Sequence, residues 1–348
     1  MMRAAVLEEI GRLRLKQVPV PEPGPGEVLV RIEANTICGT DLRIISGAKT
    51  AGVRPGVILG HEFAGRVAAV GRGVDGVPVG AQVTCSIVVS CQRCRACLSG
   101  REQLCENLVL FGYELDGGLA EYLLVPRIAM DHGNLVVLEK EIPATTLALA
   151  EPVSCCLNGA GQVAVAPGES VVVLGTGPIG LLHIALAKLA GATTILAAGR
   201  EGRLTAATDF GATCAVALTG EALTAEVRER THGRGADVVI VAVGDLALAN
   251  QALELAAIGG RVNYFAGFPK GKTASIDPNL IHYRELAVTG GSNARRADVR
   301  RAVELLSSGA LDVGRLVTHR FPLAELDAAV TAVARRDGLK VAVMSAAG

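Results

Sequence analysis

The sequence contains no tryptophan, and aromatic residues make up only 3% of its 348 residues. So few aromatic side chains disfavour a large ligand pocket lined by aromatic rings. The chain also lacks net charge, because Lys+Arg and Asp+Glu both total 34. Nucleic acids and anionic membranes attract proteins with an excess of basic residues, so neither is expected as a partner. These absences favour a small polar ligand.

Long uninterrupted apolar runs are absent as well. The most apolar stretch, residues 171–199, contains Pro178, His183, Lys188 and several glycines, whereas a membrane-spanning helix needs about 20 mostly apolar residues. The first residues have neither the apolar core nor the small-residue cleavage pattern of a signal peptide. We therefore expect a cytoplasmic protein with no membrane partner. Thiols stay reduced in that compartment, so clustered cysteines indicate metal binding or catalysis.

The pattern of apolar residues changes near Glu151. Before it, short apolar runs such as EVLVRIEA and GAQVTCSIVV are broken by Gly and Pro, which predicts antiparallel β-structure. After it, strand-like runs such as VVVLG and ADVVIVAVG alternate with helical stretches, which predicts parallel βαβ units. We predict an α/β protein with a Rossmann doubly wound domain at 153–287. The remaining segments, 1–152 and 288–348, are predicted to form the other domain.

A glycine-rich loop, GTGPIG, follows the apolar run VVVLG and precedes a helical stretch. In this context Gly175 permits a tight turn, Gly177 lets a pyrophosphate approach the backbone, and Gly180 lets the helix pack closely. The N–H groups at the start of the helix then face the phosphates. The predicted cofactor-binding residues of the loop are Gly175, Thr176, Gly177, Pro178, Ile179 and Gly180.

The residues after the second strand of this domain bear on the choice of dinucleotide. NAD sites usually place an acidic residue there for the ribose hydroxyls, but this chain has Ala198 and Gly199. Arg200 supplies a guanidinium group that suits a 2′-phosphate. We therefore predict NADP, held by Gly199, Arg200 and Arg203. The alternative is NAD, with Glu201 serving the ribose.

Four of the nine cysteines lie in one segment, CQRCRACLSGREQLC, at Cys91, Cys94, Cys97 and Cys105. Thiolates at this spacing suit one tetrahedral Zn²⁺, and four of them leave no open position, so the predicted site is structural. An iron–sulfur cluster is the rival interpretation, but the spacing does not match the ferredoxin runs.

A second group of potential ligands is dispersed along the chain: Cys38, His61, Glu62 and Glu151. Taken singly, a cysteine or a histidine is more often a packed core residue. Together they supply a thiolate, an imidazole and carboxylates, which are the ligand types of an open zinc site.

The motifs GHEFAGRVAAVG, DGGLAEYLLVP, EPVSCC, GTGPIG and GGRVNYFAG, with the four-cysteine segment, cover essentially the whole chain. With them the chain resembles the zinc-containing medium-chain dehydrogenase/reductases, most closely their polyol (sorbitol-type) and threonine-dehydrogenase-like branch. The resemblance implies that the first domain is GroES-like and that each subunit holds two zinc ions, one catalytic and one structural. It also implies a homo-oligomer, a dimer or a tetramer, that pairs through an edge strand within RVNYFAG.

The resemblance further implies roles for single residues. Cys38, His61 and Glu151 would bind the catalytic zinc, and Glu62 would be an alternate ligand. Asp41 would orient His61, as metal-bound imidazoles require.

Two positions depart from the family pattern. Cys155 and Cys156 lie close enough to Glu151 in sequence for either of them to replace or supplement it as a ligand. Arg43 stands where a histidine often closes the proton relay, and arginine cannot accept a proton at ordinary pH. The relay beyond Thr40 must then use ribose hydroxyls and water, or another side chain.

The predicted activity is the reversible oxidation of a secondary alcohol to a ketone, with hydride transfer to NADP and with Thr40 passing the proton outward. The predicted substrate is a polyol, sugar, sugar phosphate or cyclitol. One alternative is NAD-dependent oxidation of an amino alcohol, as by an L-threonine 3-dehydrogenase. A remote alternative is a non-catalytic dinucleotide-binding protein.

Overall fold

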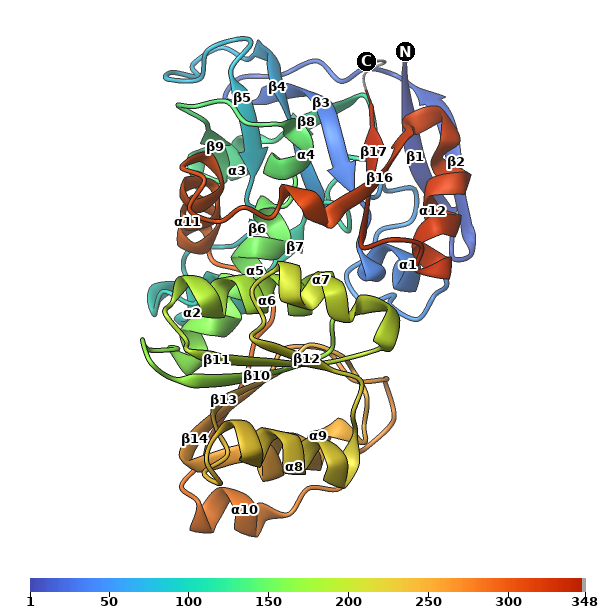
Figure 1. Ribbon diagram of the computed structural model, residues 1–348. Coiled ribbons are helices and arrows are strands. Elements are labelled where there is room, and N and C mark those ends of the chain that lie inside the picture. Colours follow the sequence, from blue (N-terminus) through green and yellow to red (C-terminus); the bar gives the residue numbers. More distant parts are fainter. Residues whose placement is uncertain (346–348) are drawn as a thin grey trace. The chain divides into compact units, whose positions relative to one another are not determined.

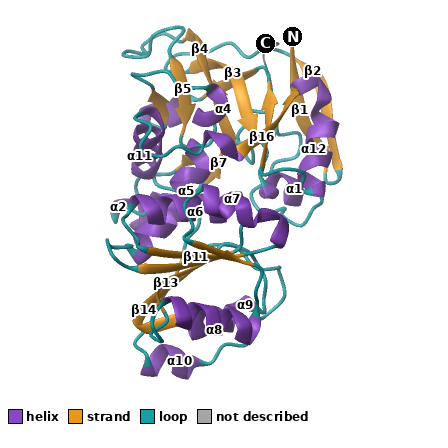
Figure 2. Ribbon diagram, viewed as in Figure 1, coloured by secondary structure: helices purple, strands orange, loops and turns teal. Residues whose placement is uncertain are grey.

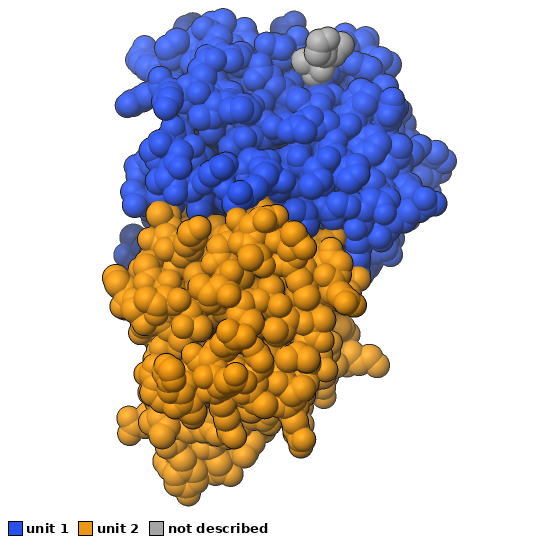
Figure 3. Space-filling model, in the orientation of Figure 1, with its two compact units in different colours: residues 1–154, 293–348 blue, residues 155–292 orange. Residues whose placement is uncertain are grey.

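The computed structural model describes residues 1–345 of the chain (Figures 1 and 2). The chain divides into two compact units, which are coloured separately in Figure 3. Unit 1 comprises Met1–Ser154 together with the segment from Asn293 onward, and unit 2 comprises Cys155–Ser292. No described helix is both long enough and apolar enough to cross a membrane.

Unit 1 is built around a mainly antiparallel sheet in the order β16-β17-β3-β4-β5-β9, with β8 also paired to β3. Thr36 of β3 is opposite Glu62 of β4, and only the β16–β17 pair in this sheet is parallel among the described strands. The strands of the unit are β1 (Met2–Glu9), β2 (Arg12–Val18), β3 (Val28–Thr36), β4 (Glu62–Val70), β5 (Gln82–Cys85), β6 (Val88–Val89), β7 (Val109–Leu110), β8 (Tyr122–Val125), β9 (Leu135–Val137), β16 (Val317–Pro322) and β17 (Lys340–Met344).

The helices of unit 1 range from 4 to 12 residues in length among the described residues. They are α1 (Gly39–Ile45), α2 (Arg95–Leu98), α3 (Arg127–Asp131), α4 (Ala144–Leu147), α11 (Arg296–Ser307) and α12 (Leu326–Arg335), with 3-10 turns η1 (Glu102–Leu104), η3 (Gly314–Leu316) and η4 (Leu323–Glu325). Helix α5 (Ala150–Val163) begins in this unit. Apolar side chains of α1 and α12, such as Ile44 and Leu326, pack with Val341 of β17 into one buried cluster. The segment from Asn293 onward is the return segment, and this cluster fixes it against the first part of the chain.

Unit 2 contains a parallel sheet in the order β12-β11-β10-β13-β14-β15. Its strands are β10 (Ser170–Leu174), β11 (Thr194–Ala198), β12 (Cys214–Val216), β13 (Ala236–Val241), β14 (Ala256–Tyr264) and β15 (Ala287–Gly290). Strand order reverses between β10 and β13, which is where doubly wound sheets bind their ligands. The predicted combination of an antiparallel β domain with a Rossmann domain is confirmed.

Helices cover both faces of this parallel sheet. In Figure 1, α6 (Pro178–Leu189) and α7 (Leu204–Asp209) lie on one face, and α8 (Gly220–Arg230) and α9 (Leu248–Leu255) lie on the other. The remaining helical pieces are α10 (Pro278–Tyr283) and η2 (Glu201–Arg203). With both faces covered, every residue of β10 is buried. Burying one Val or Leu side chain fully contributes about 1.5–3 kcal/mol, which explains the unbroken apolar run of this strand.

The edge of this sheet differs from the prediction. Residues 261–264 belong to β14, and β14 pairs with β13 on one side and with β15 on the other. The segment RVNYFAG therefore does not form an edge of the sheet, whose outer strands are β12 and β15. The apolar side chain of Val288 on that strand is 37% exposed.

Candidate active site and metal centres

The four clustered cysteines bring their sulfurs to one point. Cys94 Sγ lies 3.5 Å from Cys97 Sγ and 3.9 Å from Cys105 Sγ, and the four sulfurs, that of Cys91 included, lie within 4.8 Å of one another. A tetrahedron with metal–sulfur bonds of about 2.3 Å has edges of about 3.8 Å. None of the four is in a disulfide. These sulfurs fit a single zinc ion that has no open position.

Backbone N–H groups support negative charge in this loop. Cys91 N–H and Asn107 N–H donate to Cys105 Sγ at 3.2 and 3.3 Å. The N–H groups of Arg93 and Cys94 lower the pKa of Cys91 to about 6. Hydrogen bonds to a charged form stabilise it, so Cys91 is prepared to be a thiolate. Burial instead raises the pKa of Cys97 and of Cys105.

The cysteine loop is fastened to the return segment by residues that the sequence did not single out. Arg296, which begins α11, donates its N–H to Glu102 Oε1 at 3.1 Å and its Nη1–H to Ser90 Oγ at 3.2 Å. Glu102 and Ser90 are buried. The contact spans 194 residues, so it left no local signal in the sequence.

A second cluster joins Cys38, His61 and Glu62, whose ligand atoms lie within 4.8 Å of one another. Cys38 follows β3 and caps α1, while His61 immediately precedes β4, of which Glu62 is the first residue. Because β3 and β4 are paired with Thr36 opposite Glu62, the two strands bring these side chains together. A thiolate, an imidazole and a carboxylate form a donor set that suits zinc.

Asp41 holds His61 in place, as the resemblance implied. Its Oδ1 lies 3.2 Å from His61 Nδ1, and its Oδ2 accepts the Cys38 N–H at 2.8 Å. Both side chains are buried. Burial lowers the pKa of His61, but the Asp41 carboxylate raises it, and the pKa lies well above its ordinary value. With Nδ1 directed at Asp41, Nε2 remains for a metal ion.

Glu62 has a buried cationic partner that was not predicted from the sequence. Lys340, the first residue of β17, places its Nζ 2.6 Å from Glu62 Oε1, and the Thr36 hydroxyl donates to Glu62 Oε2. Lys340 and Glu62 are 7% and 0% exposed. Burial alone would lower the pKa of Lys340, but the Glu62 carboxylate raises it. Glu62 is therefore held as a charge-balanced carboxylate at the edge of the cluster.

Tyr113 borders the cluster, whereas Glu151, the third predicted zinc ligand, is not among the residues whose ligand atoms lie within 4.8 Å of one another. The Tyr113 ring centroid lies 5.5 Å from that of His61. Burial is the main cause of the raised pKa of Tyr113, and the charge of Glu151 acts in the same direction. The charge of Glu151 also raises the pKa of Lys340. Cys155, four residues further along α5, is half-buried.

Thr40 and Arg43 lie on α1 beside the cluster. Arg43 Nη2 donates to Thr40 Oγ1 at 2.7 Å, and Arg43 is exposed. Because the guanidinium group cannot accept a proton, this contact orients the Thr40 hydroxyl without extending a proton relay.

The glycine loop of unit 2 has the geometry that its residues predicted. Gly175 adopts φ +106°, in the region that favours glycine. A Cβ on Gly180 would lie 1.7 Å from the Gly175 carbonyl oxygen, so α6 packs too close to the loop for any side chain. A Cβ on Gly177 would meet no atom within 4 Å. Open space therefore faces the start of α6, where phosphate groups bind in such loops.

The end of β11 excludes a side chain at one of the two positions where an acid was sought. A Cβ on Gly199 would lie 2.0 Å from Thr176 Oγ1, and Thr176 is buried. Arg200 follows and is exposed, and Arg203 is half-buried at the end of η2.

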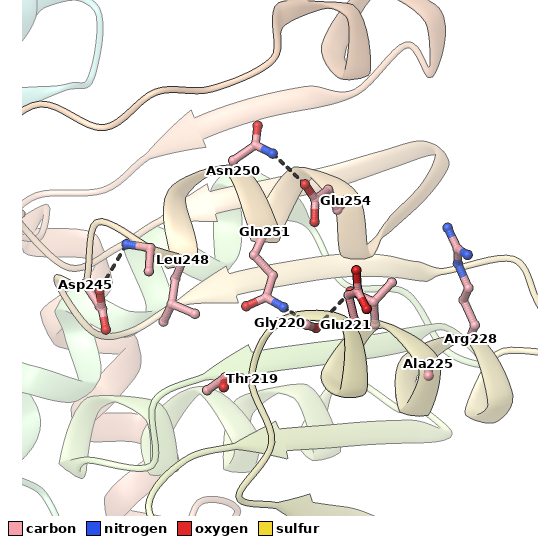
Figure 4. A pocket seen from close by; sticks show the side chains of 12 residues that line it. Thr219, Gly220, Glu221, Ala225, Arg228, Asp245, Leu248, Asn250, Gln251 and Glu254 are labelled. Carbon is pink, nitrogen blue, oxygen red and sulfur yellow. Dashed lines mark hydrogen bonds between the residues drawn. The ribbon is translucent and has the colours of Figure 1, made fainter.

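A groove of about 750 Å³ runs along α8 and α9, from Thr219 and Asp245 before these helices to Arg228 and Glu254 near their ends (Figure 4). Its polar lining includes Thr219, Asp245 and Gln251, and Gln251 Nε2 donates to Gly220 O at 2.7 Å. Thr219 and Asp245 follow β12 and β13, so one end of the groove lies at the carboxyl end of the sheet. Its size is in the range of small-molecule sites. No residue of this groove was predicted, since its lining consists of ordinary loop and helix-surface residues.

Comparison with known proteins identifies the family. Residues 24–132 match the model of the alcohol dehydrogenase GroES-like domain, and residues 178–308 match that of the zinc-binding dehydrogenase. The chain belongs to the zinc-containing medium-chain dehydrogenase family. The predictions of family, fold class and enzyme class are therefore confirmed.

Relatives in this dehydrogenase family include the L-threonine 3-dehydrogenase of Pyrococcus furiosus, which is 37% identical over 88% of this chain and 87% of its own. A chain from Sinorhizobium meliloti, described as a zinc-binding dehydrogenase and solved with NADP bound, is 36% identical, covers 99% of both chains and has a TM-score of 0.92. The 2R,3R-butanediol dehydrogenase of Bacillus subtilis is 28% identical over 99% of this chain and 100% of its own, with a TM-score of 0.89. The dehydrogenase is thus a zinc- and nicotinamide-dependent oxidoreductase that acts on alcohols. The threonine relatives agree better with the amino-alcohol alternative than with the polyol prediction.

Proposed function

We propose that this dehydrogenase oxidises the secondary hydroxyl of a small polar substrate to a ketone, with NADP as the hydride acceptor. The observation that carries the proposal is the buried cluster of Cys38, His61 and Glu62, with Asp41 behind the histidine. Such an arrangement of unlike donors suits a catalytic metal, which needs an open position for substrate.

Cys38, His61 and Glu151 would hold the catalytic zinc, with Glu62 as the alternate ligand, and Cys155 would be the substitute for Glu151. The four sulfurs of the cysteine loop would hold the structural zinc. When bound, the catalytic zinc lowers the pKa of the substrate hydroxyl and the nicotinamide accepts hydride. Asp41 keeps the His61 ring oriented throughout.

Thr40 would accept the proton of the substrate hydroxyl and pass its own outward. Its Oγ1 keeps one lone pair free, because Arg43 occupies only one of the two. By donating to Thr40 Oγ1, Arg43 limits the rotation of the Thr40 hydroxyl. The hydroxyl proton then points away from Arg43 and can be donated to another group.

The preference for NADP rests on the end of β11. Arg200 and Arg203 would bind the 2′-phosphate beside Gly199, where the space is closed to an acidic side chain. NADP in the Sinorhizobium relative supports this assignment. The rival assignment, NAD with Glu201 at the ribose, has an exposed Glu201 in its favour.

The first candidate substrate is L-threonine or another β-hydroxy amino acid, because relatives 33–37% identical are L-threonine 3-dehydrogenases. A diol or polyol is the second candidate, supported by the butanediol dehydrogenase. We further infer a cytoplasmic dimer or tetramer that pairs through the exposed edge of β15.

The test is a metal analysis with an assay of one substrate panel against NADP and NAD. The panel comprises L-threonine, 2,3-butanediol, sorbitol, glycerol 3-phosphate and myo-inositol. Two zinc ions per subunit and NADP-dependent oxidation of at least one secondary alcohol are expected. Zinc-loaded protein that oxidises no member of the panel with either cofactor would refute the proposed function.

A further inference from the structure

Lys49 lies over the aromatic ring nearest to the catalytic cluster. Its Nζ is 5.2 Å from the centroid of Tyr113, and that centroid is 5.5 Å from the His61 ring. An ammonium group over an aromatic face is attracted by the ring. Lys49 is half-buried and Tyr113 is buried. The cation is therefore held at a defined position one ring away from a proposed metal ligand.

The loop that carries Lys49 also fixes it to Arg43. The Lys49 N–H donates to the Arg43 carbonyl oxygen at 2.9 Å, and the Arg43 side chain contacts Thr40 Oγ1 at 2.7 Å. Lys49 and Arg43 are thus joined through the backbone, and Arg43 contacts the hydroxyl that would take the substrate proton.

Their positive charge is not balanced by the carboxylates nearby. Asp116 pairs with Arg54 at 2.8 Å, and Glu114 Oε2 accepts the Leu110 N–H at 3.0 Å. Among residues 1–345, no carboxylate lies within 4 Å of the cationic nitrogens of Lys49 or Arg43. A fixed pair of cations without counter-charge beside a substrate site favours an anionic ligand.

We propose that Lys49, assisted by Arg43, binds an anionic group of the substrate, a carboxylate or a phosphate, a few bonds from the reacting hydroxyl. This inference rests on the proposed function and narrows its substrate class. Tyr113 would position the ammonium group. Arg43 would act on the same anion while orienting Thr40, so its loss affects binding and turnover together, whereas loss of Lys49 affects binding alone.

The kinetic test compares the wild-type enzyme with Lys49→Met on charged and neutral secondary alcohols. L-Threonine offers a carboxylate, glycerol 3-phosphate offers a phosphate, and 2,3-butanediol is neutral. We expect KM for the preferred anion to rise about tenfold or more, as expected for a lost hydrogen bond to a charged group, with KM for 2,3-butanediol unchanged. Which anion responds distinguishes the two sources. The matched control is Lys140→Met, an exposed lysine of the same unit.

Two kinetic results would overturn the anion site. One is an equal change for charged and neutral substrates, and the other is a rise confined to KM for NADP, which would assign Lys49 to the cofactor. The variant Lys49→Arg keeps the charge and should retain most of the selectivity, which a purely structural role of Lys49 would not require.

A binding measurement separates this inference from the proposed function. Zinc-loaded enzyme saturated with NADP is titrated calorimetrically with inorganic phosphate and with acetate. If no alcohol is oxidised but an anion binds about tenfold more weakly to Lys49→Met, the proposed function fails and the anion site stands. Equal affinity in wild type and variant for both probes would refute the anion site.

Discussion

Unit 1 presents its functional atoms on side chains, whereas unit 2 presents them on the backbone. In unit 1 a thiol, an imidazole and carboxylates are buried together, and each is held by a named partner such as Asp41 or Lys340. In unit 2 the predicted phosphate site consists of glycines whose missing side chains leave space.

This difference has an energetic cause. Buried charge is stable only when it is paired and hydrogen-bonded, so unit 1 needs residues from distant segments to compensate each group. Backbone N–H groups at the start of a helix are available in any sequence, so unit 2 needs only the absence of Cβ atoms at the right positions. Substitutions in unit 1 should therefore remove metal-binding or charge-balancing groups. Substitutions in unit 2 should introduce steric clashes or change the selectivity between NADP and NAD.

The largest effect is expected for His61→Ala. Losing a metal ligand should lower kcat/KM roughly 10³-fold or more, since the metal supplies several kcal/mol. Zinc analysis should show one ion per subunit retained by the cysteine loop. The exposed His232 provides the control variant His232→Ala. Undiminished activity in His61→Ala would mean that the cluster is not the catalytic metal site.

Lys340→Met should be the next most damaging change, because it leaves the Glu62 charge buried without its partner. Breaking a buried ion pair costs about 3–5 kcal/mol, to be measured by urea unfolding of the metal-free protein. Lys340→Arg keeps the charge and should lose much less. The double variant Lys340→Met with Glu62→Gln should recover part of the loss, and no recovery would mean that the pair is not the cause.

Arg200→Asp tests the cofactor assignment of unit 2. Removing a charge-assisted contact and adding repulsion should raise KM for NADP roughly tenfold or more while leaving stability unchanged. KM for NAD should fall. If KM for NADP does not rise, the 2′-phosphate is bound elsewhere. An aspartate at Gly199 would be a poor test, since its Cβ would collide with Thr176.

The pair Gly180→Ala and Gly177→Ala separates packing from binding in the glycine loop. Gly180→Ala should destabilise the protein by about 1–3 kcal/mol, because its Cβ meets the Gly175 carbonyl. Gly177→Ala should leave the melting temperature unchanged and weaken NADP binding, since its Cβ enters open space. Similar melting temperatures for both variants would contradict this assignment of roles.

The smallest effect concerns His183 of α6, which is buried with no hydrogen-bond partner on either ring nitrogen among the described residues. Burial lowers its pKa to about 3, so below the unfolded-state pKa near 6.5 the unfolded chain binds the extra proton and stability falls. His183→Leu should be stabilising by about 1 kcal/mol at pH 7.5 and by more at pH 5.5. Melting temperatures at both pH values provide the measurement, and a pH-independent difference would contradict the explanation.

Two parts of the site could be predicted from spacing, because their residues lie close together in the chain. The cysteine loop spans 91–105 and the glycine loop 175–180, so spacing alone restricts their geometry. Cys38, His61 and Glu62 were grouped by ligand type and by family resemblance. The ion pair of Lys340 with Glu62 was missed because a lysine at the start of an apolar run usually points to solvent.

The edge of the unit 2 sheet shows the same limit. An apolar strand pattern does not reveal how many neighbours a strand has, so RVNYFAG and AVTG could not be ranked as inner and outer strands. Pairing register, which depends on the whole sheet, decided that β15 is outermost.

The sequence by itself determined the alternation of strands and helices, the two local loops and the supply of zinc-binding side chains, because periodicity, spacing and residue chemistry act over short distances. The tertiary structure alone decided which distant charges meet: Lys340 with Glu62, Arg296 with Glu102, and Lys49 over Tyr113 beside His61. These contacts depend on strand pairing and on burial across the whole of unit 1. The interaction between charges weakens with their distance in space and does not depend on their separation along the chain. These pairs could therefore be identified only in the folded protein.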